Sequence, residues 1–234
     1  MEEKTRSSLC RKNYRRRGEK VLRKLCIGTR GSRLALAQVR EVVEKLGVKE
    51  IAIKIYNTSG DLDKVTPIEK VEGTDFFTDK IEQALLGHEI DLAVHSAKDL
   101  PETIPEGLAI AVITRSIDPS DILVSRGNFK LGELPQGARV GTSSGRRKKQ
   151  LLQVRPDLEV ADLRGNLDER LEKLDRGEYD AIVVAAAGLI RLGLAERITE
   201  RLPFETAKGQ GALALEIRKE DQELELWLKE KFIS

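Results

Sequence analysis

The sequence is poor in aromatic residues, cysteine and histidine. Aromatic residues make up 4% of the 234 residues, with one tryptophan, so leucine, isoleucine, valine and alanine must fill the core, as is usual in α/β proteins. Two cysteines and two histidines are too few and too scattered for a zinc site, and they fit a reducing cytoplasm. No apolar run approaches the roughly 18 residues that a membrane helix needs. We therefore expect a cytoplasmic α/β protein with no metal and no membrane partner.

Positive charge is concentrated at the N-terminus. Residues 1–24 hold ten basic residues against three acidic ones, which leaves residues 25–234 with a net charge of −5 out of the chain's +2. A mildly acidic body argues against a protein that binds nucleic acid through its fold. We interpret residues 1–24 as a solvated, disordered extension. Contact with RNA or an anionic surface, or a start codon placed too early, are the alternatives.

Strand-like and helix-like segments alternate from residue 25 onward. In the first half, strands are predicted at 25–29, 51–55, 91–95 and 108–114, helices at 34–46 and 77–86, and a polar loop at 58–75. In the second half, strands are predicted at 122–125, 138–141, 158–163 and 181–186, and helices at 145–154, 166–176 and 187–194. A last strand at 212–217 and a helix at 220–232 follow the turn Gly209–Gly211.

This alternation predicts βαβ units in parallel or mixed sheets. Residues 115–119 form a plausible first hinge. If the last strand returns to the first sheet, the chain crosses twice between two lobes with a cleft between them. We therefore divide the chain into the extension 1–24, domain 1 over 25–114 plus 209–234, and domain 2 over 119–206.

Residues that directly follow the predicted strands are unusually basic and rich in hydroxyl groups. Ligands of doubly wound sheets bind beyond the carboxyl ends of the strands, so these residues are the binding candidates. They are Arg30, Ser32, Ser96, Lys98, Thr142, Ser143, Ser144, Arg146, Arg147 and Arg164, with Arg170 and Arg191 in the helices that follow. Guanidinium groups bind carboxylates through paired hydrogen bonds, and free amides at a helix start add anion-binding donors. Any one arginine could be an ordinary surface residue, but their shared placement predicts a ligand with several carboxylates.

Asp99 is the one acid within this basic set. It is a candidate for proton transfer or for stabilising a cation, and a turn or helix-cap role is the alternative. His95 precedes it on the predicted strand, where it is either a buried strand residue or a supporting one.

Five segments resemble motifs of the porphobilinogen deaminase (hydroxymethylbilane synthase) family. They are IGTRGSRLALAQ at 27–38, DLAVHSAKDLP at 91–101, VGTSSGRR at 140–147, LRGN at 163–166 with Arg170, and GQGA at 209–212. The resemblance implies a two-lobed, periplasmic-binding-protein-like α/β transferase, most simply a monomer. Such an enzyme joins four porphobilinogen molecules into hydroxymethylbilane, with release of ammonia, in tetrapyrrole and haem biosynthesis.

The resemblance also implies roles for individual residues. Asp99 would protonate the leaving amine and stabilise the cationic pyrrole intermediate. Acetate and propionate groups would be held by Arg30, Ser32, Lys98, Arg146, Arg147, Arg164, Arg170 and Arg191. Lys70 matches one of two loop lysines, and Gln210 and Gly211 belong to the last motif.

The family further implies a dipyrromethane cofactor, linked through a thioether to a cysteine of a third domain. The chain as given ends at Ser234, before that domain would begin, and neither Cys10 nor Cys26 matches the attachment position. Thr74 stands where the second loop lysine is usual. We therefore expect an enzyme that holds its primer without a covalent bond or receives the third domain from a partner chain. The alternative is a non-catalytic binding module for anionic pyrroles or related polycarboxylates.

Overall fold

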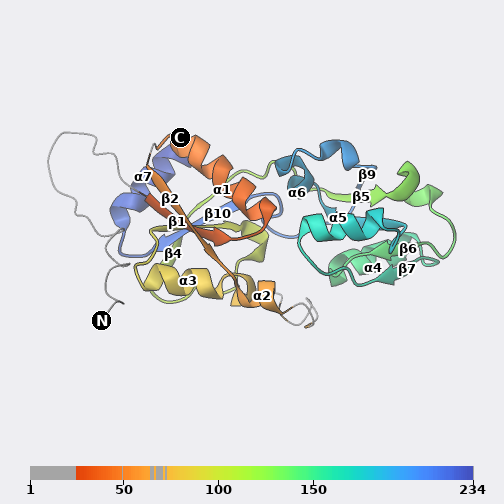
Figure 1. The fold of residues 1–234 in the computed structure, drawn as a ribbon, viewed down its shortest axis with the longest axis horizontal. Helices are drawn as coiled ribbons and strands as arrows, with labels where there is room; N and C mark the ends of the chain where they lie inside the picture. The colour runs from red at the N-terminus through yellow and green to blue at the C-terminus, as the bar shows by residue number, and fades with distance from the viewer. Residues whose placement is uncertain (1–24, 49, 64–65, 67–70, 72, 234) are drawn as a thin grey trace.

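The computed structural model describes residues 25–48, 50–63, 66, 71 and 73–233, and these residues form two α/β lobes that lie side by side along the long axis (Figure 1). The extension predicted at 1–24, Cys10 and Lys70 lie outside the described residues. Within the described ranges, no helix combines the length and apolarity that crossing a membrane requires.

Lobe 1 is built on a five-stranded sheet in the order β2-β1-β3-β10-β4. Its strands are β1 (Leu25–Arg30), β2 (Ile51–Tyr56), β3 (Leu92–Ser96), β4 (Leu108–Ile113) and β10 (Leu213–Arg218). β1 pairs in parallel with β2 and β3, whereas β10 runs antiparallel between β3 and β4. Side chains of α1 (Arg33–Leu46) and α7 (Gln222–Ile233) pack on one face of the sheet, and those of α3 (Asp79–Leu86) pack on the other.

Lobe 2 repeats this arrangement in a second sheet of order β7-β6-β8-β5-β9. Its strands are β5 (Asp121–Ser125), β6 (Arg139–Gly141), β7 (Glu159–Ala161), β8 (Ala181–Ala185) and β9 (Glu200–Leu202). β6 is parallel to β7 and β8, and β5 is antiparallel to β8 and β9. The α4 helix (Gly145–Val154) packs on one face, and α5 (Leu167–Asp175) and α6 (Ala186–Arg191) pack on the other.

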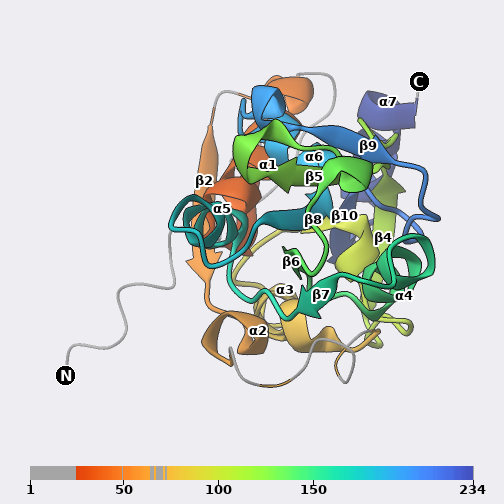
Figure 2. The ribbon, with the colours of Figure 1, turned by 90° about the vertical axis from the view of Figure 1, so that its right-hand side faces the viewer.

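The chain crosses between the lobes twice, once from β4 to β5 and once from β9 to β10. In each sheet the first strand after a crossing, β5 or β10, is the antiparallel one. Figure 2 views the molecule from the end of lobe 2, with lobe 1 behind it. The expected two-lobed α/β fold with mixed sheets is therefore confirmed.

Short polar residues place the helix starts next to the strand ends. Ser32 follows β1 and caps α1, with its Oγ accepting a hydrogen bond from the Ala35 amide at 3.2 Å. Asn166 follows β7 and caps α5 by accepting from the Glu169 amide at 3.0 Å, while the Glu169 carboxylate accepts from the Asn166 amide. These caps satisfy amides that have no partner within the helix, and they fix where the strand-end residues point.

Three local expectations differ from the structure. The alternation of Ile51, Ile53 and Ile55 predicts a half-buried strand, but Ile53 is 45% and Ile55 is 57% exposed, because β2 is an edge strand and no described element covers them. The loop expected at 58–75 contains a short helix, α2 (Ser59–Leu62), held by the Asp61 carboxylate, which accepts from the amide and hydroxyl of Thr58. Strand β9 was not predicted.

Candidate active site

Residues at the strand ends of the two lobes meet. Lys98 and Asp99 lie in a 3-10 turn directly after β3, within electrostatic reach of Arg147 and Arg170 from lobe 2. Arg164 Nη2 of lobe 2 donates to the carbonyl of Asp63 in lobe 1 at 3.0 Å. We call Arg30, Lys98, Asp99, Arg147, Arg164 and Arg170 the strand-end site.

Asp99 lines a pocket of about 90 Å³ on the lobe 1 side of the strand-end site. The pocket lining includes Thr29, Arg30, His95 and Ser96. Asp99 is partly buried, and among the described residues it has no hydrogen-bond partner. Its carboxyl group is therefore available to a ligand in a strongly cationic setting.

Three cations of the strand-end site form no salt bridge with a described carboxylate. The Lys98 side chain as a whole is exposed, but its ammonium group is surrounded by protein. This desolvation lowers the pKa of Lys98 to about 8. The charge of Asp99 opposes the shift, whereas the charges of Arg147 and Arg170 add to it. Desolvation likewise lowers the pKa of Arg170 to about 10, helped by Arg147 and Arg164. Nη1 of Arg164 is buried and has no hydrogen-bond partner. This is a cluster of positive charge that lacks its anion.

The other predicted arginines hold acids of the chain itself. Arg30 Nε donates to both carboxylate oxygens of Asp61 at 3.0 and 3.1 Å, and its guanidinium lies 4.9 Å from the ring centre of Phe77. Arg191 Nε donates to Glu41 of lobe 1 at 2.6 Å. A ligand carboxylate can bind either arginine only if it displaces the protein carboxylate, Asp61 or Glu41, that is already paired with it.

Arg146 and Arg147 share one acid, Asp121. Arg147 Nε donates to Asp121 Oδ1 at 2.9 Å. Arg146 Nη2 lies 2.7 Å from Asp121 Oδ2 without the alignment of a hydrogen bond, and Arg146 Nη1 also donates to the Glu205 carbonyl. Desolvation lowers the pKa of Arg147, and Asp121 opposes this.

Most of the predicted hydroxyl groups serve the protein's own backbone and side chains. Ser96 Oγ accepts from Gln38 Nε2 at 2.8 Å. Ser143 Oγ bridges the amide and carbonyl of Leu163, and the buried Thr142 Oγ1 accepts from the Ser144 amide at 3.4 Å. Among the described residues the Ser144 hydroxyl has no partner, so it is the hydroxyl at the start of α4 that is open to a ligand.

Gln210 and Gly211 lie in the second crossing. Gln210 is buried, and its Nε2 donates to the Pro119 carbonyl at 2.6 Å and to Asp121 Oδ1 at 2.9 Å. Gly211 has a φ of 82°, and a Cβ there would lie 2.3 Å from Ser116 Oγ, so glycine is required. The structure therefore places this turn in contact with the first crossing. Sequence reasoning missed Asp121, although an acid directly before the apolar run Ile122–Val124 was a visible signal.

His95 and Cys26 are both buried. His95 Nε2 lies 3.1 Å from Glu216 Oε2, so it is paired within lobe 1. Cys26 is 2% exposed and packs in the cluster under α3. A thiol in that position cannot reach a ligand in the strand-end site.

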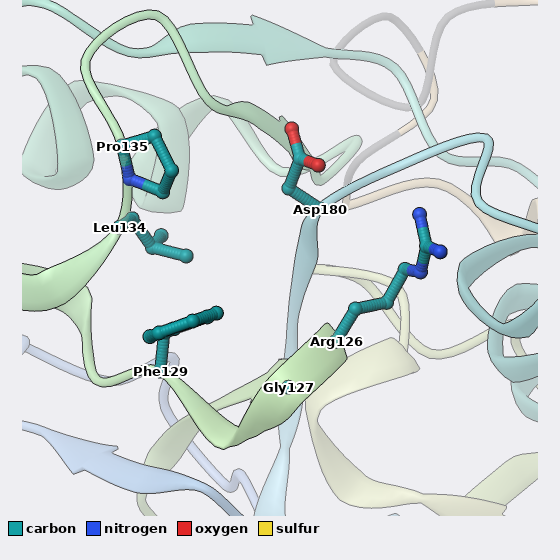
Figure 3. Close-up of a pocket in the computed structure, with 6 residues that line it drawn as sticks. All are labelled: Arg126, Gly127, Phe129, Leu134, Pro135 and Asp180. Atoms are coloured by element: carbon teal, nitrogen blue, oxygen red, sulfur yellow. The ribbon is translucent and has the colours of Figure 1, made fainter.

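A second pocket, of about 260 Å³, lies at the ends of the lobe 2 strands that are far from Arg147 (Figure 3). It is lined by Arg126, Gly127, Phe129, Leu134, Pro135 and Asp180. β5 and β8 run antiparallel, and Ser125 pairs with Ala181 at the strand ends near this pocket. At the other strand ends Asp121 pairs with Ala185, and Asp121 contacts Arg147 there. None of the predicted site residues lines this pocket.

Comparison with known proteins agrees with the motifs. The family profile described as "Porphobilinogen deaminase, dipyromethane cofactor binding domain" matches residues 25–226. The porphobilinogen deaminase of Thermus thermophilus is 53% identical over 207 residues, which cover 86% of this chain and 67% of that protein. The porphobilinogen deaminase of Syntrophus aciditrophicus is 48% identical over 209 residues, covering 86% and 68%.

A solved structure agrees with the two-lobed fold alone. An ancestral cationic amino acid solute-binding protein has a TM-score of 0.50 and 15% identity, with 89% of this chain and 88% of that chain covered. The fold is thus shared with proteins of unrelated sequence, whereas the strand-end motifs are shared with the deaminases. The chain therefore belongs to the porphobilinogen deaminase family.

Proposed function

We propose that the chain is a transferase of tetrapyrrole biosynthesis, which joins four porphobilinogen molecules head to tail, releases one ammonia for each, and yields hydroxymethylbilane when water adds to the terminal methylene group. One observation carries the proposal: a single acid, Asp99, faces a pocket beside cations that lack an anion, Lys98, Arg164 and Arg170. Porphobilinogen brings two carboxylates and one leaving amine. The site offers a matching set of cations and one proton donor.

Asp99 carries the proton chemistry in this proposal. Its carboxylic acid gives a proton to the aminomethyl nitrogen, the carbon–nitrogen bond breaks, and ammonia leaves. The resulting carboxylate faces the cationic pyrrole and stabilises it. When the carbon–carbon bond forms, the accepting pyrrole carbon loses a proton to Asp99, which restores the acid. The cycle thus leaves Asp99 unchanged.

The cations bind and orient the substrate. Lys98, Arg164 and Arg170 are the first anchors for acetate and propionate groups, because no described carboxylate pairs with them. Arg30, Arg146, Arg147 and Arg191 serve as further anchors as the chain of pyrroles grows, with Ser32, Ser96, Thr142, Ser143, Ser144 and the Gln210–Gly211 turn supporting the backbone around them. Lys70, in the loop at 58–75, is also proposed to bind substrate carboxylates.

The dipyrromethane cofactor of the family fits these residues. The buried, unpartnered Arg164 Nη1 and the shifted pKa of Lys98 mark a place where carboxylates are needed, so we propose that Lys98, Arg164 and Arg170 hold its acid groups. When bound, the cofactor supplies the pyrrole carbon to which the first substrate is joined. Attachment through Cys26 is not proposed, because this thiol is buried in β1.

The finer assignments follow the same proposal. We place the domain boundaries at the two crossings, with 25–114 plus 209–234 forming domain 1 and 119–206 forming domain 2. We also propose a cytoplasmic location and a monomeric chain.

The test is an assay of the purified protein with porphobilinogen, with and without a preassembled bilane as primer. Ammonia and, after acid oxidation, uroporphyrin are followed over time. We expect both products, and we expect the intact mass of the protein to equal that of the unmodified chain. Tight binding of porphobilinogen without ammonia under both conditions would instead indicate a non-catalytic binding module.

A further inference from the structure

Asp121 is the most deeply buried acid of lobe 2. It begins β5, directly after the first crossing, and has no exposed surface. Burial raises the pKa of Asp121, but the charge and hydrogen bonds of Arg147 and the hydrogen bond from Gln210 outweigh it, so its pKa lies below the ordinary value. Asp121 is therefore a buried carboxylate whose charge is matched inside the protein.

Both interlobe crossings are tied to this carboxylate through Gln210. The Gln210 side chain donates to Asp121 Oδ1 and to the Pro119 carbonyl, and its Oε1 accepts from Arg147 Nη2 at 3.3 Å. The Gln210 carbonyl accepts from Ser116 Oγ at 2.8 Å. Pro119 and Ser116 lie in the first crossing and Gln210 lies in the second. One cluster of hydrogen bonds therefore joins the two crossings.

The same cluster reaches the strand-end site. Arg147 Nη2 lies 2.7 Å from Asp121 Oδ1, and Arg147 Nη1 donates to the Val183 carbonyl at 3.4 Å. The guanidinium of Arg147 is thus fixed on three sides while it faces Lys98 and Arg170. The charged groups that act on Lys98 are Asp99 from its own turn and Arg147, Arg170 and Asp121 from lobe 2.

We propose that Asp121 and Gln210 are positioning residues that fix Arg147 in the strand-end site and lock it to both crossings of the hinge. The inference rests on the proposed function, because Arg147 matters as a ligand for pyrrole carboxylates. Its consequence is that lobe angle and anion binding are coupled: a change in the hinge displaces a substrate-binding cation. Asp121 also supplies negative charge that helps Lys98 to keep its proton.

The test compares Asp121→Asn with Asp118→Asn. Asp118 lies three residues away, accepts from Ser120 and Arg201, and lies outside the Asp121 cluster, so it is a matched control. Spin labels on Glu44→Cys in α1 and Glu172→Cys in α5, in a chain with Cys10→Ser, report the interlobe distance without ligand. Equilibrium binding of porphobilinogen is measured from pH 6 to pH 10.

Asp121→Asn is expected to broaden the interlobe distance distribution, weaken porphobilinogen binding at least about tenfold, and move the loss of binding at alkaline pH to a lower pH. Gln210→Met keeps the Asp121–Arg147 pair and serves if Asp121→Asn does not fold; it should broaden the distances while the alkaline loss of binding stays in place. Distances in both variants that match Asp118→Asn would overturn the proposal. Absence of ammonia release by the wild type bears on the proposed function alone, because the distance readout needs no turnover.

Discussion

The two lobes share one strand order but use their interiors differently. Lobe 1 buries titratable side chains beneath α3, where Glu82, His95 and Glu216 lie against the sheet. Lobe 2 has apolar clusters on both faces of its sheet. Its buried charged residues within the described ranges are Asp121 and Arg147, which lie beside the two crossings. The same topology therefore supports a polar interior beneath α3 in lobe 1 and apolar packing on both faces of the sheet in lobe 2.

The difference teaches where function lies in a two-lobed fold. Lobe 1 carries the proposed proton donor, Asp99, together with Lys98 and Arg30, and lobe 2 carries most of the guanidinium groups. The proposed site therefore draws on both sheets and is complete only when the lobes are held together.

The largest effect is expected for Asp99→Asn in lobe 1. Loss of a positioned proton donor should reduce turnover by about 10²–10⁴-fold, while porphobilinogen binding persists because the cations remain. Steady-state ammonia release and equilibrium binding are the measurements. Asp162→Asn, an exposed acid next to β7 of lobe 2, is the control and should act like the wild type. Near-normal turnover of Asp99→Asn would show that Asp99 is not the proton donor.

The next effect concerns the cations of lobe 2 that lack a carboxylate. Arg164→Leu and Arg170→Leu should each weaken porphobilinogen binding by about 1.5–3 kcal/mol, the scale of charge-assisted hydrogen bonds. Arg191→Leu should cost less binding, because a ligand must first displace Glu41. Calorimetric titration measures all three, with the exposed Arg176→Leu as control. Equal losses of binding free energy in Arg191→Leu and Arg170→Leu would show that pairing with a protein carboxylate does not decide how much an arginine contributes to binding.

A smaller, pH-dependent effect is expected from Lys98. Its pKa of about 8 means that the free protein loses this positive charge as pH rises through that value, so carboxylate binding should weaken by up to about tenfold per pH unit above it. Lys98→Arg keeps the charge and should move the decline to higher pH. Titrations from pH 6 to pH 10 test this, with Lys149→Arg as control. A decline that stays in place in Lys98→Arg would assign it to another group.

The smallest effect concerns stability and separates the two interiors. Burial raises the pKa of Glu82 above 4.5, aided by Glu216 and opposed by a hydrogen bond from Thr78. A raised folded-state pKa gives stability that is complete below the unfolded-state pKa and is lost as pH rises through the folded value. Glu82→Gln should therefore flatten the fall in unfolding free energy between pH 4.5 and neutrality. Urea unfolding measures it, and the exposed Glu196→Gln of lobe 2 should keep the wild-type slope.

Most of the fold was predictable from hydrophobic patterning. The helix predicted at 145–154 matches α4, and the return of the last strand to the first sheet is seen in β10. Patterning could not tell that Ile53 and Ile55 stay exposed, because period alone does not say whether a helix covers an edge strand. The short helix at Ser59–Leu62 was missed although Thr58 and Asp61 have the spacing of a helix cap.

The strand-end site was predictable as a set of residues, but the partners of its cations were not. Sequence placed the arginines after strands, and the structure brings Arg147, Arg164 and Arg170 near Lys98 and Asp99. Which arginines already hold a carboxylate depends on contacts between residues far apart in the chain, such as Glu41 with Arg191. Such pairs leave no periodic signal. The position of Asp121 before the strand was visible in the sequence, but its pairing with Arg147 was not.

The position of β10 has a consequence for the order of folding. This strand separates β3 from β4 in the middle of the lobe 1 sheet, yet it is synthesised after all of lobe 2. As the chain emerges from the ribosome, lobe 2 has all of its strands while lobe 1 still lacks a central one. Lobe 2 can therefore fold first as a contiguous unit, and lobe 1 must keep a gap between β3 and β4 open until Leu213–Arg218 arrives. The lobe that carries Asp99 is the last to close.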